Sequence, residues 1–598
     1  MNFARKQGFH DISLYDIDCL RPSFEDAVAE ILRRKPDVLG ISAVVSTAYA
    51  YTRKLSRAVK EALPDTLIVV GGNMAASAEI LLRRTGIDLC VTGEGEAVFA
   101  NLLARARATR DLRDFRDVGG LVLLNGDGDL VNTGYEPALR PEELYDIDWS
   151  DLEMGSRIEH FFPKVADNVT LLSETFHYDG RLFEAHRLEK TYGFLYTAKG
   201  CVSRCTFCHR WDKGLRRIPL DIVMARLEEM IRRYNLGFLN IADEMFGADK
   251  KKLLEFCERI KPYDIMWTAS TRVTGITADL MRTIVDAGCA NLNYGTESGS
   301  ERILQVMEKK TSVAQNREAI RLSYEFGAVA PIALVIGMPG EDRETIRETI
   351  ELCKFAKTLD KRINPNNLSI NYAQALPGTP LYEYGRRKGL IGQDLDGEEG
   401  YLLAISDRDA HDEFATLNFT DYPTLETQTW RPLITVEVNQ HFVRTFGIDQ
   451  YLRVVLADLD LEGTAGSDSG YYANPKRLIE QARSSAPVAK EGDDLPAPRP
   501  PSLWRLVRSG RWGLALVCHP VLAYRLRRFL LGLVFLKNIR KFGWSYSLGL
   551  LQEYLAFHFA FRRRPATPPA RSLRKMVEED MGALPGDAPA MAPLRKGR

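Results

Sequence analysis

The sequence predicts an α/β protein: an N-terminal Rossmann-like, doubly wound parallel sheet, then a partial β/α barrel, then a helical C-terminal extension. Its 598 residues exceed the usual size of a single hydrophobic core. Short β-rich runs alternate with amphipathic helical stretches in two separate series, which is the rhythm of βαβ units on parallel sheets. The expected parts are 1–135 (α/β domain), 136–190 (connector), 191–385 (barrel), 386–462 (accessory region), 463–502 (flexible linker), 503–564 (basic helical tail) and 565–598 (disordered).

In the first series we expect strands at 12–16, 37–42, 67–72, 89–94 and 120–125, with helices between them. The segment 125–134, NGDGDLVNTG, predicts a polar hairpin. Small residues follow three of the strands, and ligands on such sheets bind at the carboxyl ends of strands. The residues singled out there are Ser42, Ser46, Thr47, Gly71, Gly72, Gly93, Glu94 and Gly95.

The second series begins near residue 193 and contains six candidate strands, the later ones at 237–242, 264–270, 290–295, 331–337 and 368–375. Helical patterns lie between them at 219–234, 249–261, 276–288, 312–327 and 342–358. Repeated β/α units predict a partial or complete parallel barrel, with its chemistry on the loops after the strands.

Composition excludes several classes of protein. Eighty basic residues balance eighty acidic ones, so the surplus of positive charge typical of nucleic-acid binding is missing. A mean hydropathy of -0.21 argues against a polytopic membrane protein. Nine scattered cysteines and no apolar leader at the start predict a reduced, cytoplasmic protein without a disulfide framework.

The tail at 503–564 combines apolar and aromatic runs with basic residues. It carries twelve Lys and Arg against one acid, Glu553, and no apolar run reaches the roughly 18 residues that span a bilayer. Two interpretations stay open: a helix lying on an anionic membrane surface, and a basic helical pair packed on the barrel.

Three cysteines crowd into one loop after the first barrel strand. Cys201, Cys205 and Cys208 have the spacing C-x3-C-x2-C. Soft thiolates select zinc or iron-sulfur centres. A closed zinc site needs a fourth ligand, and the nearest candidate, His209, directly follows Cys208 and would have to turn back on the same ion. The spacing therefore favours a 4Fe-4S cluster with one open iron, over zinc as the alternative.

This spacing, with Phe207 before the last cysteine, resembles the radical S-adenosylmethionine (SAM) superfamily. The resemblance implies that the open iron binds SAM, which one electron cleaves to methionine and a deoxyadenosyl radical. It also implies SAM contacts for Phe207, for ADEMFG (Asp243, Glu244), for YGTESGS (Glu297, Ser298) and for GMPGE (Gly337, Pro339, Gly340). The structural alternatives are that Asp243 and Glu244 only cap a helix and that Glu297 only pairs with an arginine such as Arg272.

PDVLGIS, VVGG, VTGEGE and LPGTPLY extend the resemblance to the subgroup with an N-terminal cobalamin-binding domain, whose members include methyltransferases and an anaerobic porphyrin cyclase. The resemblance covers about residues 10–385 and implies that the eight residues singled out in the first series, Glu94 included, line the corrin or its nucleotide tail. The chain begins at what should be the first helix of that domain, so its first strand is missing, and a degenerate domain that binds nothing is the alternative. The D-x-H-x-x-G motif is also absent, but the subgroup commonly lacks it, so the resemblance implies a lower cobalt face without histidine.

The sequence thus predicts an enzyme that cleaves SAM and modifies an unactivated carbon of a small molecule, by cobalamin-dependent C-methylation or by cyclase or oxidoreductase chemistry. The substrate class suggested by the tail is a lipid, isoprenoid or tetrapyrrole taken from a membrane surface, and an electron donor such as flavodoxin or ferredoxin is implied. The rivals are a non-catalytic cobalamin or metal sensor and an electron-transfer iron-sulfur protein. Peripheral contact with the inner membrane surface through 503–564 is one of the two interpretations of the tail.

Overall fold

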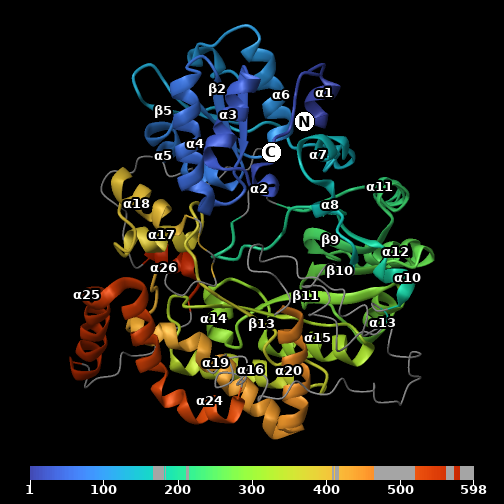
Figure 1. Ribbon diagram of the computed structural model, residues 1–598, viewed down its shortest axis with the longest axis vertical. Helices are drawn as coiled ribbons and strands as arrows, with labels where there is room; N and C mark the ends of the chain where they lie inside the picture. Colours follow the sequence, from blue (N-terminus) through green and yellow to red (C-terminus); the bar gives the residue numbers. More distant parts are fainter. Residues whose placement is uncertain are drawn as a thin grey trace.

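The computed structural model describes residues 1–165, 181, 184–209, 214–406, 408, 410, 417–462, 519–560 and 571–579. Figure 1 shows the N-terminal domain at one end, the green barrel strands in the middle and some of the C-terminal helices, coloured orange, at the other end. The linker expected at 463–502 lies outside the described residues, as do 503–518 and 561–564 of the tail.

The N-terminal sheet has the order β1-β2-β3-β4-β5, with β1 (Val38–Ser42), β2 (Leu67–Gly71) and β3 (Leu89–Val91) parallel. The hairpin of β4 (Leu121–Leu124) and β5 (Leu130–Asn132) is antiparallel, as the polar turn predicts. The helices of this domain are α1 (Asn2–Lys6), α2 (Ile17–Leu20), α3 (Phe24–Arg34), α4 (Tyr49–Ala62), α5 (Ala78–Arg84) and α6 (Gly95–Ala106).

The strand expected at 12–16 does not form, and that prediction was wrong. The Asp16 amide donates to the carbonyl of Gly155, at the end of α7 (Ser150–Gly155), over 3.0 Å. The Asp16 carboxylate accepts from the Cys19 amide and caps α2. A Cβ on Gly155 would lie 2.5 Å from the Leu14 carbonyl oxygen, so the segment packs closely on the connector instead of on the sheet.

All six expected barrel strands are present, in one sheet of order β13-β12-β11-β10-β9-β6 whose neighbours are parallel. The strands are β6 (Thr191–Leu195), β9 (Leu236–Phe246), β10 (Met266–Thr271), β11 (Cys289–Glu297), β12 (Ile332–Ile336) and β13 (Leu368–Tyr372). The predicted helices appear as α11 (Leu220–Tyr234), α12 (Lys250–Ile260), α13 (Ala278–Asp286), α15 (Val313–Phe326) and α16 (Arg343–Lys357). The partial barrel and the α/β class are confirmed.

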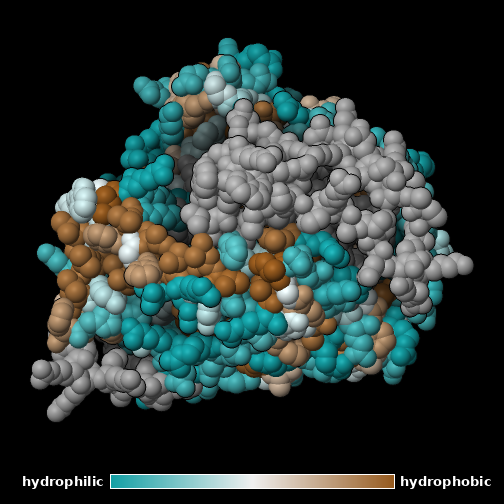
Figure 2. All heavy atoms as spheres, turned by 60° about the horizontal axis from the view of Figure 1, so that its bottom comes forward, coloured by the Kyte–Doolittle hydropathy of each residue, from teal (hydrophilic) through white to brown (hydrophobic). Residues whose placement is uncertain are grey.

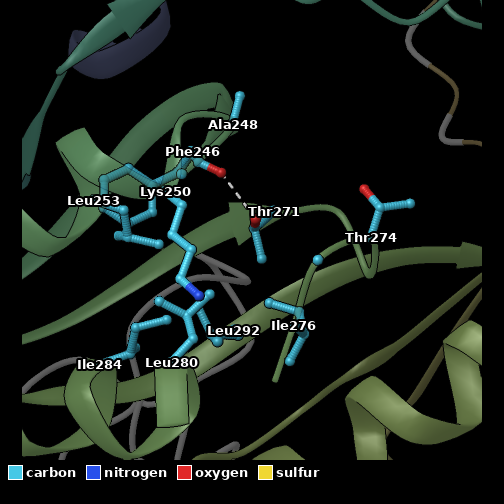
Figure 3. Close-up of a pocket in the computed structure, with 12 residues that line it drawn as sticks. Phe246, Ala248, Lys250, Leu253, Thr271, Thr274, Ile276, Leu280, Ile284 and Leu292 are labelled. Atoms are coloured by element: carbon cyan, nitrogen blue, oxygen red, sulfur yellow. Dashed lines mark hydrogen bonds between the residues drawn. The ribbon is translucent and has the colours of Figure 1, made fainter. Parts of the chain in front are cut away.

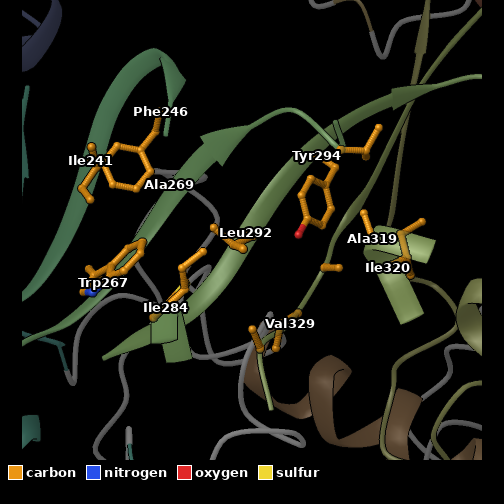
Figure 4. Packing of buried hydrophobic residues seen from close by; sticks show 14 of the residues in the cluster. Ile241, Phe246, Trp267, Ala269, Ile284, Leu292, Tyr294, Ala319, Ile320 and Val329 are labelled. Atoms are coloured by element: carbon orange, nitrogen blue, oxygen red, sulfur yellow. The ribbon is translucent and has the colours of Figure 1, made fainter. Parts of the chain in front are cut away.

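The barrel core lies between this sheet and its helices. Trp267 of β10 is fully buried among Phe246, Ile241 and Ile284, and its indole nitrogen donates to the Ala287 carbonyl over 2.9 Å (Figure 4). Tyr294 of β11 is equally buried, and its hydroxyl lies 3.0 Å from the Ser323 hydroxyl. Both polar groups are therefore satisfied inside an otherwise apolar core.

The C-terminal part is helical, as expected. It comprises α17 (Pro380–Arg387), α18 (Leu395–Ile405), α19 (Thr424–Phe446), α20 (Ile448–Glu462), α24 (Pro520–Leu526), α25 (Leu530–Ala560, kinked at Gly543) and α26 (Leu573–Glu579). Helix α26 lies in the region expected to be disordered, so that expectation was wrong for these residues. Among the described residues, no helix has both the length and the apolar character needed to cross a membrane.

The two sheets share a second core. This core joins residues of the N-terminal domain, such as Ile68 and Met74, to Leu381 of α17, Leu402 of α18 and Leu573 of α26. In Figure 1, α17 and α18 lie between the N-terminal domain and α26. The Tyr49 hydroxyl of α4 donates to Glu399 of α18 over 2.8 Å inside this contact.

Candidate active site

The cysteine loop leaves the carboxyl end of β6, at the edge of the sheet where the other parallel strands also end. Before it, Gly200 has a φ of 91°, in the left-handed region that favours glycine. The chain on either side forms a small antiparallel hairpin of β7 (Ala198–Lys199) and β8 (Arg216–Arg217). This hairpin fixes both ends of the segment that carries the cysteines.

None of the three loop cysteines forms a disulfide within the described chain, and their sulfurs lie near enough to act on one another's charge. Desolvation by the surrounding protein raises the pKa of Cys208 to about 11 although the residue still reaches solvent, and the sulfurs of Cys205 and Cys201 raise it further. Burial also raises the pKa of Cys205, while Lys309 and Arg272 lower it. The Cys201 sulfur lies 4.0 Å from the Met245 sulfur of β9.

Three neighbouring segments hold the loop. The Thr206 amide donates to the Met307 carbonyl over 3.0 Å, and the Thr206 carbonyl accepts from the Leu381 amide over 3.1 Å. The Arg272 guanidinium at the end of β10 donates to the Ser203 hydroxyl and to the Lys309 carbonyl. The loop is therefore anchored to the start of α17, the end of β10 and the turn after α14 (Glu301–Val306).

This donor set fits an iron-sulfur cluster. Each thiolate of a cubane binds a different iron, so the three sulfurs need to be near one another without meeting at one point. The cations Arg272 and Lys309 offset the negative charge that three thiolates would bring. In the described parts of the chain, no three His, Cys, Asp or Glu side chains are grouped to hold a single metal ion.

The two acidic residues predicted near SAM have different environments. The buried Asp243 carboxylate accepts from the amides of Thr197, over 2.7 Å, and Ala198, over 3.0 Å. Burial raises its pKa, and these hydrogen bonds act in the opposite direction. Asp243 thereby fixes the chain that leads into the cysteine loop. Glu244 is exposed, and its charge acts on Cys208, so it lies beside the loop.

Glu297 and Ser298 also differ. Glu297, at φ 56°, forms an ion pair of 2.7 Å with Lys309, not with Arg272 as the structural alternative expected. Ser298 is buried and its hydroxyl lies 3.3 Å from the Thr349 hydroxyl of α16. Glu297 thus belongs to the charged surroundings of Cys205, whereas Ser298 braces the turn after β11.

The GMPGE turn after β12 is stabilised by its own last residue, Glu341. Its buried carboxylate accepts from the amides of Gly337 and Met338, and burial raises its pKa to about 8. Gly337 and Gly340 have φ angles of 84° and 78°, so the turn requires glycine there. Pro339 is buried in the same turn, and Phe207 packs on the shared core that contains Met338.

Arg272, Lys309 and Glu341 are site residues that sequence reasoning missed as functional. Glu341 ends the quoted GMPGE segment and could have been found from it. Lys309 had no such signal because it belongs to no quoted segment and reaches the loop only through the fold.

In the N-terminal domain, the loops after β1 and β2 touch. The Ala43 amide donates to the Gly71 carbonyl over 2.9 Å, and a Cβ on Gly72 would lie 2.5 Å from the Ala43 carbonyl oxygen. Val44 and Val45, beside them, are 61% and 53% exposed. An apolar loop beside a glycine turn fits a flat ring such as a corrin.

The remaining residues proposed for the corrin are spread around this edge. Ser42 is exposed, Ser46 is buried, Thr47 is half-buried, and Gly93 and Gly95 flank Glu94 at the start of α6.

Glu94 forms the direct link from this domain to the cysteine loop. Its carboxylate pairs with Lys199 over 2.8 Å and with Arg216 over 2.5 Å, the two facing residues of the β7–β8 hairpin, and accepts from the Leu139 amide. Burial raises its pKa, but the hydrogen bonds from Arg216 and Lys199 prevail and lower it to about 2.

A separate cavity of about 150 Å³ lies beside the ends of β9 and β10, where Lys250 reaches toward Leu280, Ile284 and Leu292 (Figure 3). The Thr271 hydroxyl donates to the Phe246 carbonyl across its rim over 2.8 Å. None of its lining residues is a predicted site residue.

Two family models match the chain. The model described as B12 binding domain covers residues 1–103, and the model of the radical SAM superfamily covers residues 195–353. The second match contains the cysteine loop and strands β9 to β12.

Curated relatives match over the same region. The anaerobic magnesium-protoporphyrin IX monomethyl ester cyclase of Cereibacter sphaeroides is 28% identical over 58% of this chain and 54% of its own length. The cytidylyl-2-hydroxyethylphosphonate methyltransferase of Streptomyces wedmorensis is 24% identical over 54% of this chain and 62% of its own length. The chain therefore spans little more than half of these relatives.

Solved structures share the fold. The radical SAM methyltransferase TsrM of Kitasatospora setae, with cobalamin and a [4Fe-4S] cluster bound, has a TM-score of 0.53 at 15% identity, covering 81% of this chain and 95% of that one. The cobalamin-dependent SAM radical enzyme OxsB has a TM-score of 0.54 at 15% identity, covering 95% of this chain and 72% of that one.

Proposed function

We propose that this chain, which matches a B12 binding domain model ahead of a radical SAM model, is a cobalamin-dependent radical SAM enzyme that modifies an unactivated carbon of a small molecule. The observation that carries the proposal is the loop of Cys201, Cys205 and Cys208 at the carboxyl edge of the barrel, anchored on three sides.

The residues around the loop have separate tasks in this proposal. The loop would hold a 4Fe-4S cluster that supplies one-electron cleavage of SAM, and the N-terminal domain would hold cobalamin, which supplies methyl transfer. The three thiols hold the cluster, and Arg272 and Lys309 offset its charge. We assign SAM contacts to Phe207 in the loop, to Glu244 and Glu297, whose charges act on the loop cysteines, and to the turn at Gly337, Pro339 and Gly340.

Asp243 and Ser298 act by fixing the backbone, because both side chains are already engaged by the protein. Ser42, Ser46, Thr47, Gly71, Gly72, Gly93 and Gly95 border the proposed corrin surface. Glu94, the remaining residue of that set, ties this surface to the cysteine hairpin.

Methylation and ring cyclisation are both compatible with the relatives, which include enzymes named for each. We favour C-methylation because a solved neighbour described with cobalamin bound is a methyltransferase and the curated relatives also include a methyltransferase. A small electron carrier such as flavodoxin or ferredoxin would supply the reducing electron.

Anaerobic reconstitution with iron, sulfide, SAM, dithionite and cobalamin tests the proposal. We expect 5'-deoxyadenosine and retention of corrin through gel filtration. Cys205→Ala should abolish formation of 5'-deoxyadenosine. Cys19→Ala, at a cysteine outside the loop, should leave its formation unchanged. Corrin binding or one equivalent of zinc, with no SAM cleavage in the wild type, would instead indicate a sensor.

The surface of α25 supports a membrane-derived substrate. Its inner face packs on α19 through Leu550 and Asn538, whose amide donates to Gln428 over 2.9 Å. Trp544, Leu548, Leu555 and Phe559 form a stripe on the second half of the helix and are 41% to 79% exposed. Figure 2 shows apolar side chains gathered on this side of the molecule.

Exposed cations, including Arg528, Lys537, Arg540 and Lys541, lie before the kink at Gly543, and Glu553 is the only acid between residues 519 and 560. A basic segment followed by an apolar stripe suits an anionic lipid surface. We therefore propose that α25 makes peripheral contact with a membrane and that the substrate is a lipid, isoprenoid or tetrapyrrole held there.

Sedimentation with phosphatidylserine vesicles checks this contact. The wild type should pellet with the vesicles, and Leu548→Glu with Phe559→Glu should remain in the supernatant. Met154→Glu, at a residue 77% exposed on α7, is the matched control and should still pellet. If the wild type were a dimer that did not bind vesicles, and the Leu548→Glu and Phe559→Glu variant were a monomer, the stripe would instead be a contact with a second copy of the chain.

A further inference from the structure

Helix α26 is docked although it is only seven residues long. Leu573 is fully buried and Val577 nearly so, both in the core shared with Leu381 and Tyr384 of α17. The Arg387 guanidinium of α17 also donates to the Val577 carbonyl. Packing by two buried side chains and a hydrogen bond fixes a helix that would not be stable alone.

The docked helix brings Arg574 to the cysteine loop. Its guanidinium donates to the carbonyl of Arg204 over 3.1 Å, and Arg204 stands between Cys201 and Cys205. The same guanidinium lies 3.4 Å from the carboxylate of Glu308, which is 18% exposed. Glu308 belongs to the turn whose Met307 carbonyl accepts from the Thr206 amide. Arg574 therefore joins the loop to the turn that supports it.

The other anchors of the loop come from the barrel and from α17. They act on Ser203 and Thr206, whereas the described contacts give Arg204 its bond from Arg574. A guanidinium can hold a carbonyl and a carboxylate at once because its donors point in fixed, divergent directions. We propose that α26 is a clasp on the cysteine loop, with Arg574 as its positioning residue.

Hydrogen–deuterium exchange on the full chain without a cluster tests the clasp directly. Arg574→Gln should speed exchange of the peptide covering 201–209 by about fivefold, which corresponds to about 1 kcal/mol for one lost hydrogen bond. Lys575→Gln, which removes the neighbouring exposed cation, should leave that exchange unchanged. Equal exchange in Arg574→Gln and the wild type would overturn the proposal.

A second readout uses the reconstituted protein and rests on the proposed function. Iron transfer to a chelator should be faster in Arg574→Gln than in Lys575→Gln. Arg574→Lys should restore part of the difference, because a single ammonium group can keep the ion pair with Glu308 but not the hydrogen bond to the Arg204 carbonyl as well. Unchanged iron release would reject a role in holding the cluster. If the wild type assembles no cluster, the proposed function fails, while the exchange result still decides whether the clasp exists.

Discussion

At the scale of single residues, Glu94 shows how a residue suited to ligand binding is used inside the protein. Sequence reasoning placed it in the corrin pocket because it stands between two glycines after a strand. The structure engages both of its oxygens with Arg216, Lys199 and the Leu139 amide. Its carboxylate therefore couples the N-terminal domain to the hairpin on which the cysteine loop is built.

Replacing this carboxylate should weaken the fold in a pH-dependent way. We expect Glu94→Gln to lose about 2 kcal/mol of unfolding free energy at pH 7, since two partly buried cations lose their partner. The folded pKa of about 2 lies below the ordinary value, so the stabilisation is present above pH 4.5 and is lost as pH falls toward 2.

Denaturant unfolding at pH 7 and pH 3 measures this difference, with Glu96→Gln on the same helix as the control. The gap between wild type and Glu94→Gln should narrow at pH 3. A gap of the same size at both pH values would show that the ion pairs contribute nothing.

The site residues could be predicted from the sequence where a local motif identifies them. They could not be predicted where the fold brings distant segments together. The cysteine spacing and the glycines of GMPGE are local patterns. The partners of Asp243 and Glu297 are not, because Thr197 and Lys309 meet them only once the strands are in register. Side-chain pairing across a sheet edge depends on that register and on loop paths, which one sequence does not reveal.

At the scale of elements, the turn after β2 illustrates a strict backbone requirement. Gly72 has a φ of 91°, and its α-carbon passes so near Ala43 that a methyl group would collide with the carbonyl. The loops after β1 and β2, which we propose contact the corrin, both depend on this close approach of Gly72 to Ala43.

Gly72→Ala should therefore destabilise the N-terminal domain by about 2 kcal/mol, through backbone strain and the collision together. It should also abolish corrin retention while 5'-deoxyadenosine is still formed, because the barrel is untouched. Gly126→Ala, in open space in the β4–β5 hairpin, should change neither. If a well-folded Gly72→Ala protein still retained corrin, the corrin would have to bind at another site.

The long elements could be predicted since hydrophobic periodicity repeats along them, and all six barrel strands lie within a few residues of expectation. The short ones could not. The run at 12–16 alternates like a strand, yet Asp16 caps α2 instead. Helix α26 stands in a Pro- and Ala-rich region, and only its tertiary contacts with α17 stabilise it.

At the scale of the whole molecule, the core shared by the N-terminal sheet, α17, α18 and α26 makes the two sheets depend on each other. Tyr49 and Arg53 of α4 both bind Glu399, and the Ala50 amide donates to Ser406 at the end of α18. Separate cores joined by a linker would lack such contacts, so the sheets should unfold together.

Leu402→Ala tests this coupling, because Leu402 is fully buried at the centre of the shared core. We expect a loss of about 3 kcal/mol and a single calorimetric transition that moves as a whole to lower temperature. The adjacent Leu403→Ala, at a residue 40% exposed, should have little effect. Two transitions of which only one moves would show that the domains unfold independently.

The clasp of α26 on Arg204 has a consequence for biosynthesis. Residues 571–579 leave the ribosome long after residues 201–209, so the nascent chain presents its cysteine loop for a prolonged period without the Arg574 contact. Under the proposed clasp, a cluster inserted during that interval would enter a loop that Arg574 does not yet hold.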